Sequence, residues 1–386
     1  MLNSLLIENF RSLEKLEVPQ LGQINLIVGK NNSGKSSVLD ALKLYASFSD
    51  EGTLVDIIDE HDEFYILEED SSLSPYESLF YGRRFKENHK IIIGELNDPE
   101  TRLSIEASKA VELHLPVDKE SGGFLAYQVS YQDIDDQNEG SFEEDSNVVN
   151  TFKITQNKKT KRIILDNLAD RIYRNRNRKT KMNIKSYSDI TTSFISNDEL
   201  ADAWDKVGLR DYASKVLKAL QIIEPKIQAI NFVNAQDWGR SSLYTREKER
   251  RIPLVRIEGV DFPIPLKSMG DGIIRLFQLS LRLYEAKDGF LFIDEFENGL
   301  HFGVQKQAWE TVFELSKSLN IQVFATTHSW DCIESFTQVA LERTDIEGCL
   351  FRIGKPTRGP MKDKTTATIF TEDDLKILSQ SHVEVR

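Results

Sequence analysis

The pattern of apolar and polar positions divides the chain into regions with different predicted structures. The first 28 residues contain three short apolar runs, "SLLIENF", "LEKLEV" and "INLIV", and each has the length of a strand. Between 90 and 155, alternating runs such as "KIIIGEL", "LSIEAS" and "GFLAYQVSYQ" are separated by Gly, Asp and Pro. Because successive residues of a strand point to opposite faces, this alternation predicts an antiparallel sheet with one buried face.

Helical spacing and strand–helix alternation dominate the other regions. Residues 160–228 lack the two-residue alternation and are predicted to be mainly helical. Further on, predicted helices at about 271–287 and 300–319 alternate with the apolar runs "GFLFID" and "IQVFATT". Such alternation is typical of a parallel sheet with helices packed on it. The predicted fold is therefore α/β, with a mixed central sheet, an antiparallel β subdomain and an inserted helical lobe.

Charge is unevenly distributed along the 386 residues. The net charge of −13 argues against a surface that binds nucleic acid indiscriminately. Residues 158–185 nevertheless hold eleven Lys and Arg against two Asp, and residues 133–147 hold seven carboxylates and no basic residue. Both segments are compatible with solvated loops. The basic segment alternatively predicts a docking site for a phosphate backbone or an acidic partner.

Signals for membrane insertion and export are missing from the sequence. No apolar run approaches the roughly 20 residues that span a bilayer. The N-terminus is not a signal peptide, because Glu8 and Arg11 bracket too short an apolar stretch. Cys332 and Cys349 have neither the spacing of a metal site nor that of a disulfide framework. These observations predict a cytoplasmic protein without a membrane partner.

The segment "GKNNSGKS", residues 29–36, joins "INLIV" to a predicted helix and fits the pattern G-x-x-x-x-G-K-[ST]. In such a loop the glycines let the backbone curl, so that successive N–H groups and the helix N-terminus face a phosphate. Lys35 would contact the β- and γ-phosphates, and the Ser36 hydroxyl would ligate Mg²⁺. The predicted nucleotide-binding residues are Gly29, Asn31, Asn32, Ser33, Gly34, Lys35, Ser36 and Ser37.

A second set of candidate residues lies far downstream. The run "GFLFIDEFENGLH" contains Asp294, which can hold Mg²⁺, and Glu295, which can polarise an attacking water. Taken alone, a strand that ends in two acids is as often structural. His328 follows the next strand and would contact a γ-phosphate or hold the water. Ser268 and Gly270 precede a helix, where they form either a second anion site or a helix cap.

In this order the elements resemble the ABC-type ATPase head, with its Walker A, signature, Walker B, D-loop and switch histidine. "LLIENFRSL" and "DEFENGLH" are similar to the RecF/SMC-like branch of that group, and most similar to the AAA15 and OLD-family (overcoming lysogenization defect) ATPases. The similarity is specific over residues 1–45 and 262–335. Between about residues 100 and 230, only the position of the segment along the chain matches these families.

The resemblance implies roles for individual residues, with ATP and Mg²⁺ as cofactors. Lys35 and Ser36 would bind the nucleotide and the metal. Asp294 would be the second metal ligand. Glu295 would act as the general base, and His328 would be the switch histidine.

The same resemblance implies a homodimer or a higher homo-oligomer. Ser268 and Gly270 would cap the γ-phosphate bound by the opposite protomer, and Asn298 and Gly299 would lie in the D-loop at the dimer interface. Two chains would therefore enclose two nucleotides, and hydrolysis would be linked to opening of the dimer.

The sequence departs from these families at several positions. Its signature reads "SMGDG" where transporters have LSGGQ, and Phe302 stands where OLD-type proteins usually have proline. For the Q-loop glutamine, Gln128 and Gln132 are the candidates. An OLD nuclease would also carry a C-terminal Toprim domain, for which the 58 residues after His328 leave no room. The ATPase alone is therefore expected.

Three segments are predicted as domains. Residues 1–155 would form an N-terminal ATPase lobe with the antiparallel β subdomain, 156–235 a mainly helical inserted lobe with the basic segment, and 236–386 a C-terminal ATPase lobe. The predicted function is an ATP-driven dimer switch that controls a separate effector, a nuclease or toxin, in a prokaryotic anti-phage defence or DNA-transaction system. The choice between ATP and GTP stays open.

Three other functions compete with this prediction. The first is a RecF-like repair clamp that binds duplex DNA through residues 158–185 and "REKERR" at 246–251. The second is a nuclease centre hidden within 100–230, which is disfavoured because that region lacks clustered His, Cys or paired metal carboxylates. The third, a transporter subunit, is disfavoured because neither an LSGGQ-like signature nor a Q-loop region is evident.

Overall fold

The computed structural model describes residues 1–64, 74–85, 89–117, 126–133, 147–175, 187–192, 195–234, 251–356 and 364–381. The chain forms two compact units, each made of separate stretches of sequence. Unit 1 comprises residues 1–3, 18–39 and 183–386, and unit 2 comprises residues 4–17 and 40–182. The three contiguous domains predicted from the sequence stay a prediction.

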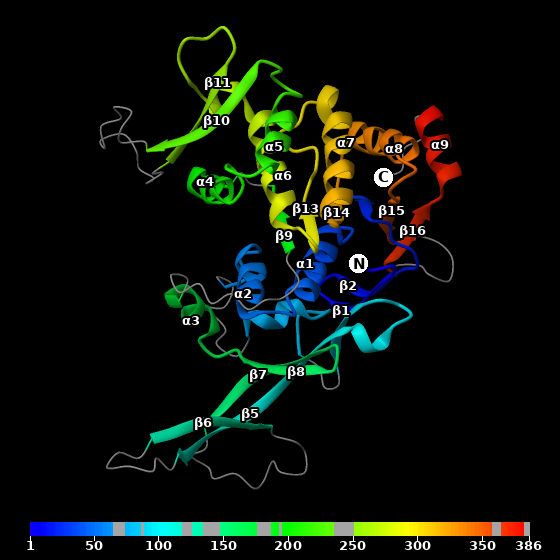
Figure 1. Ribbon diagram of the computed structural model, residues 1–386. Helices are drawn as coiled ribbons and strands as arrows, with labels where there is room; N and C mark the ends of the chain where they lie inside the picture. The colour runs from blue at the N-terminus through cyan, green and yellow to red at the C-terminus, as the bar shows by residue number, and fades with distance from the viewer. Residues whose placement is uncertain are drawn as a thin grey trace. The chain divides into compact units, whose positions relative to one another are not determined.

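Unit 1 is built on a six-stranded sheet with the strand order β16-β15-β3-β14-β13-β9 (Figure 1). Neighbouring strands run parallel except β15 and β16. Ile27 pairs with Thr326, and Ile293 pairs with both Ala325 and Ile190, so the carboxyl ends of β3, β14, β13 and β9 meet at one edge. The predicted parallel sheet is confirmed. Its strands are β3 (Ile24–Val28), β9 (Tyr187–Ile190), β13 (Phe290–Ile293), β14 (Gln322–Thr326), β15 (Gly348–Gly354) and β16 (Thr366–Phe370).

Helices enclose the core of unit 1. Trp309 on α7 stacks on Phe296, with ring centroids 3.7 Å apart, and Phe336 on α8 packs edge-on against the same indole. Helix α7 begins where His301 Nδ1 accepts a hydrogen bond from the Gly303 N–H. The helices are α1 (Lys35–Ala46), which continues into unit 2, α4 (Asn197–Asp205), α5 (Tyr212–Leu220), α6 (Asp271–Glu285), α7 (Phe302–Leu319), α8 (Trp330–Glu342) and α9 (Glu372–Ser381), with the 3₁₀ turn η5 (Leu266–Met269). A smaller antiparallel sheet contains β10 (Ile227–Asn234), β11 (Arg251–Ile257) and β12 (Ile264–Pro265).

Unit 2 contains the antiparallel sheet that the alternating sequence predicts. The strand order is β2-β1-β4-β5-β7-β8, with β6 paired to β5. Phe152 on β7 packs against the rings of Tyr76, Phe80 and Phe85. The strands are β1 (Leu5–Phe10), β2 (Leu13–Val18), β4 (Lys90–Gly94), β5 (Leu103–Val117), β6 (Ala126–Asp133), β7 (Val148–Gln156) and β8 (Lys159–Ile164). The helices are α2 (Glu51–Asp59), η2 (Pro75–Leu79), η3 (Pro99–Thr101) and α3 (Leu168–Asn175).

Residues 160–228 are less helical than the sequence predicts. Most of β8 and the start of β10 fall within them, and the four-residue strand β9 joins the central sheet beside β13. The run "YSDI" is too short to show a clear alternation, and its strand structure depends on the neighbouring strand. Local periodicity could not predict it.

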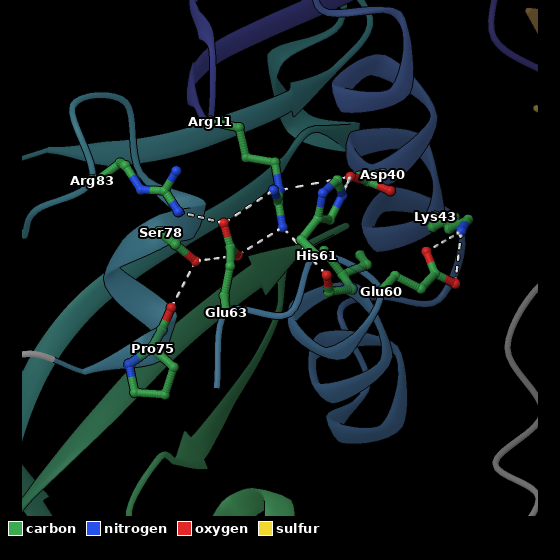
Figure 2. Close-up of polar contacts among 10 residues, drawn as sticks. Arg11, Asp40, Lys43, Glu60, His61, Glu63, Pro75, Ser78 and Arg83 are labelled. Carbon is green, nitrogen blue, oxygen red and sulfur yellow. Dashed lines mark hydrogen bonds and ion pairs between the residues drawn. The ribbon is translucent and has the colours of Figure 1, made fainter. Parts of the chain in front are cut away.

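Unit 2 also contains a buried ionic cluster, here called the Glu63 cluster (Figure 2). The Glu63 carboxylate accepts hydrogen bonds from Arg11 at 3.1 Å, from Arg83 at 2.6 Å and from the Ser78 hydroxyl at 2.6 Å. Arg11 also lies 3.6 Å from Asp40, which is on α1. The side chains of Arg11, Asp40 and Glu63 are between 5 and 9% exposed. Buried charges are costly unless they are paired, and in this cluster the charged side chains pair with one another.

Candidate nucleotide-hydrolysis site

The predicted phosphate-binding loop connects β3 to α1 in unit 1. Gly29 has a φ of +153°, and a Cβ there would lie 2.4 Å from the carbonyl oxygen of Ile353 on the neighbouring strand β15. No larger residue fits at this position. Lys35 begins α1 directly after the loop. The segment therefore has the strand–loop–helix context that a phosphate-binding loop requires.

Lys35 is nearly buried within this loop. Its ammonium group donates hydrogen bonds to the carbonyl oxygens of Gly29 at 2.9 Å and Lys30 at 3.1 Å. Burial lowers the pKa of Lys35, and the negative charges of Asp294, Glu295 and Glu297 act in the opposite direction. The lysine and the acids are far apart in the sequence, but they follow β3 and β13, whose carboxyl ends lie at the same edge of the sheet.

Other polar groups of the loop are placed to meet a ligand. Asn31, Asn32 and Ser36 are exposed, and Ser37 is half-buried. The Ser33 hydroxyl is buried and, among the described residues, has no hydrogen-bond partner. Buried polar groups are normally satisfied, so an orphaned hydroxyl beside exposed polar side chains fits a site that receives a polyanion.

Asp294 and Glu295 form a tight turn after β13. The Thr326 hydroxyl donates to Asp294 Oδ1 at 2.6 Å and accepts a hydrogen bond from the Glu295 N–H at 2.9 Å. Within the part of the chain that the structure describes, Asp294 Oδ2 has no hydrogen-bond partner. Glu295 has a φ of +50°, a left-handed conformation that costs about 1 kcal/mol or more for a residue with a side chain. Strain of this kind concentrates at functional sites.

The Glu297 carboxylate is hydrogen-bonded to the loop that carries His328. The sequence analysis did not single out this residue. Its carboxylate accepts hydrogen bonds from the Thr327 hydroxyl and from the His328 N–H, both at 2.7 Å. His328 Nε2 lies 3.8 Å from Glu295 Oε1. The His328 side chain is 36% exposed and that of Glu295 is 40% exposed. The segments that carry Lys35, Asp294, Glu295 and His328 follow strands whose carboxyl ends lie at one edge of the sheet, and the roles predicted for these residues stay predictions. A signal for Glu297 was its position within "DEFENGLH".

The predicted signature segment lies on the surface of unit 1. Ser268 and Gly270 are exposed, and Gly270 has a φ of +96°, which favours glycine. No side chain caps the N-terminus of α6 at Gly270. On the other side of this helix start, a Cβ on Gly272 would lie 3.1 Å from the Gly299 carbonyl oxygen, so the signature and the D-loop are in close contact.

A family model described as AAA ATPase domain, AAA_15, matches residues 1–333. The chain belongs to the AAA_15 ATPase family. It is therefore an ATPase, and its predicted α/β P-loop fold is confirmed by this match together with the parallel sheet of unit 1.

Two curated proteins are similar in sequence to this chain. A Helicobacter pylori protein named ATP/GTP phosphatase is 24% identical over 362 residues, which cover 89% of each chain. Uncharacterized protein MJECL10 of Methanocaldococcus jannaschii is 51% identical over 47 residues, which cover 12% of this chain and 22% of that protein.

Solved SMC heads are similar to this chain at low TM-scores. The SMC head domain from Thermotoga maritima has a TM-score of 0.44 at 14% identity, covering 96% of this chain and 99% of that one. An SMC head bound to the C-winged helix domain of ScpA has a TM-score of 0.48 at 10% identity, covering 96 and 98%. At these TM-scores the AAA_15 assignment rests on the family match alone.

The residues of this AAA_15 domain also fit a magnesium ion. In the described parts of the chain, no group of three or more His, Cys, Asp or Glu side chains is placed to hold a metal. Mg²⁺ does not need such a cage, because it is usually held by one or two protein ligands together with phosphates and water. Ser36, which is exposed, and Asp294, one of whose carboxylate oxygens has no hydrogen-bond partner among the described residues, provide that small set.

Arg275 and the end of β9 are further parts of the AAA_15 site that the sequence reasoning missed. Arg275 on α6 donates to the carbonyl oxygens of Thr191, Asp294 and Glu295. The Asn298 amide of the D-loop donates to the Thr192 carbonyl oxygen at 2.6 Å. Because the sequence gives no signal for β9, the contacts that Arg275 and Asn298 make with the residues after it could not be predicted.

The other predicted sites belong to unit 2 or lie outside the described residues. Gln128 and Gln132 lie on β6 in the sheet of unit 2. Most of 133–147, together with 176–185 and 246–250, lies outside the described residues. In the described part of the basic segment, Lys158 pairs with Glu100 and Lys161 lies over the ring of Phe48. None of the described helices is long and apolar enough to cross a bilayer.

Proposed function

We propose that this ATPase is a nucleotide-driven dimer switch. The exposed signature segment carries the proposal: Ser268 and Gly270 lie at an uncapped helix start on the surface of unit 1, where a second copy can reach them. Backbone N–H groups at a helix N-terminus attract anions, and a γ-phosphate held by the partner's phosphate loop would supply one. The nucleotide would then bind the closed dimer more tightly than the open one and shift the equilibrium by that difference.

Each residue of the site has a role in this proposal. Lys35 and the backbone of the phosphate loop bind and orient the triphosphate, and Ser36 and Asp294 hold Mg²⁺, which would neutralise developing charge on the phosphates. Glu295 accepts a proton from the attacking water. The His328 imidazole lies 3.8 Å from that carboxylate. The substrate is ATP or GTP, since the Helicobacter pylori relative carries both in its name.

Replacing Glu295 with glutamine tests this proposal. Glu295→Gln keeps the shape of the side chain but cannot accept the proton, so turnover is expected to fall about 10²–10⁴-fold. Nucleotide-dependent dimerisation, measured by light scattering coupled to size-exclusion chromatography, is expected to persist. Glu310→Gln, the same change at an exposed position on α7, is the matched control. Normal turnover by Glu295→Gln, or a chain that stays monomeric with ATP, would refute the switch.

The switch is proposed to control a separate effector, a nuclease or toxin, in a prokaryotic defence system. An adjacent open reading frame that encodes such an effector would support this role, whereas a replication or repair operon would favour a RecF-like DNA clamp. The clamp has less support from the described residues, because Lys158 and Arg174 in the basic segment already face Glu100 and Asp170. DNA binding that is absent at low salt would exclude the clamp.

A further inference from the structure

Arg275 is a buried arginine whose partners are all backbone carbonyls. It lies in the second turn of α6, with 2% of its surface exposed. One terminal nitrogen donates to the Thr191 carbonyl oxygen at 2.9 Å, and the other donates to those of Asp294 and Glu295, both at 3.2 Å. Among the described residues, no carboxylate forms a salt bridge with it. An arginine is the side chain that can bridge three acceptors in this way, because its donors form a rigid planar fork.

Burying a charged guanidinium costs more desolvation free energy than a side chain that only fills space would. Burial lowers the pKa of Arg275 to about 10, while the nearby charges of Asp294, Glu297 and Glu295 favour the protonated form. The guanidinium therefore stays charged at neutral pH inside the protein. An apolar side chain would fill the same space without the desolvation of a charge. What an apolar side chain cannot do is hold the carbonyl groups of the turn that carries the acids.

The turn held by Arg275 is the strained one. Glu295 has a φ of +50°, and a conformation of this kind persists where its surroundings fix it. The Thr326 hydroxyl accepts from the N–H of Glu295, and Arg275 donates to the carbonyl oxygens of Asp294 and Glu295. The Glu295 carbonyl oxygen also accepts from the Asn298 N–H at 2.9 Å. Arg275 thus joins the strained turn to α6.

Helix α6 begins at the signature segment. Gly270 precedes its first residue, and Gly272 in its first turn lies against the Gly299 carbonyl oxygen of the D-loop. Because a helix is rigid along its axis, a displacement of the exposed signature end is transmitted to Arg275 about one turn further on.

We propose that Arg275 is a positioning residue that couples the signature segment to the general base Glu295. The proposal rests on the proposed dimer switch: when a second copy's nucleotide engages Ser268 and Gly270, α6 moves or stiffens, and Arg275 sets the Glu295 turn in its hydrolytic position. Hydrolysis then occurs in the closed dimer and is slow in the single chain.

The test uses the full-length chain with Arg275→Met and Arg275→Lys. Arg275→Met is expected to lower kcat about 10–100-fold while KM for the nucleotide changes less than about threefold, because supporting contacts of a site carry effects of this size. Arg275→Lys is expected to recover only part of the loss, since one ammonium cannot reproduce the fork. Turnover per active chain of the parent protein should rise with protein concentration, and this rise should be lost in Arg275→Met although the nucleotide still induces dimers.

Arg282→Met is the matched control on the same helix. The Arg282 guanidinium pairs with Glu285 at 2.7 Å, and its loss should leave kcat per active chain unchanged. If Arg275→Met merely lowers the active fraction, with kcat per active chain and its concentration dependence intact, the coupling role is wrong. Full rescue by Arg275→Lys would also overturn it. Glu295→Gln separates the two proposals: if it is inactive while Arg275→Met behaves like the parent, the coupling fails and the switch stands.

Discussion

Two carboxylates in this protein, Glu63 in unit 2 and Glu295 in unit 1, have opposite surroundings. Both oxygens of Glu63 are hydrogen-bonded, to two arginines and a serine, and its side chain is 5% exposed. The Glu295 side chain is 40% exposed, and among the described residues the one ion-pair partner within 4 Å of its carboxylate is the His328 imidazole at 3.8 Å. In Glu63 the side chain is satisfied and the backbone is ordinary. In Glu295 the backbone is strained and fixed, and the side chain is left with unused acceptors.

This difference separates a structural acid from a candidate catalytic one. Buried charges that are fully paired hold segments together, whereas a reacting group needs a fixed backbone and an accessible side chain. The structure provides the second arrangement through Thr326 and Arg275, which bind the backbone or the neighbouring acid and leave the Glu295 carboxylate open. Three substitutions test this comparison, in order of decreasing free-energy effect.

Glu63→Gln is expected to cause the largest change, and it should act on stability. The substitution preserves shape but removes the charge that balances buried Arg11, so the free energy of unfolding should fall by about 3 kcal/mol. Urea denaturation followed by circular dichroism measures the loss. Turnover per folded chain should stay within about twofold of the parent, because the Glu63 cluster contains no residue of the hydrolysis site. A variant of parental stability, or one with turnover reduced tenfold, would break the distinction between the two carboxylates.

Thr326→Val should have a smaller effect, directed mainly at activity. Valine matches the shape of threonine but lacks the hydroxyl that holds Asp294 and the Glu295 N–H, so kcat should fall about 10–100-fold. The free energy of unfolding should fall by about 1 kcal/mol, because a partly buried N–H loses its partner. Thr368→Val, at an exposed position on β16 of the same sheet, is the control. Equal kcat values for the two variants would show that the hydroxyl does not position the acids.

The sequence predicts those parts of the site that lie in consecutive residues. "GKNNSGKS", "FIDE" and "TTHS" each place the reacting groups at the end of a strand, and the structure brings these ends to one edge of the sheet. The antiparallel sheet of unit 2 follows from its alternation in the same way. Local patterns therefore account for the predicted phosphate loop, for the two acids and for His328.

The supporting residues could not be predicted because they act between segments. Arg275 looks like an ordinary polar position within an amphipathic helix, and its role depends on β9, whose four residues show no independent strand signal. Thr326 becomes important only because β14 is the neighbour of β13. A sequence shows which side chains are present, but the packing of strands decides which backbone groups they hold.

Lys306→Ala should have the smallest effect. It measures how little an exposed ion pair contributes to the free energy of unfolding, for comparison with the buried Glu63 cluster. The Lys306 ammonium lies 2.8 Å from Glu342 across α7 and α8, with 38 and 56% of the two side chains exposed. Solvent screens such a pair, so the substitution should cost less than about 1 kcal/mol and leave turnover unchanged. The hydrogen bond that the Lys306 ammonium donates to the Glu342 carboxylate raises the pKa of Lys306 above its ordinary value of 10.5, so this small contribution is present below pH 10.5 and is lost as the pH rises further. Urea denaturation of parent and variant at pH 8 and at pH above 11 measures it. A loss above 2 kcal/mol would mean that exposure does not distinguish this pair from the Glu63 cluster, and burial could then not be the reason for the large effect expected there.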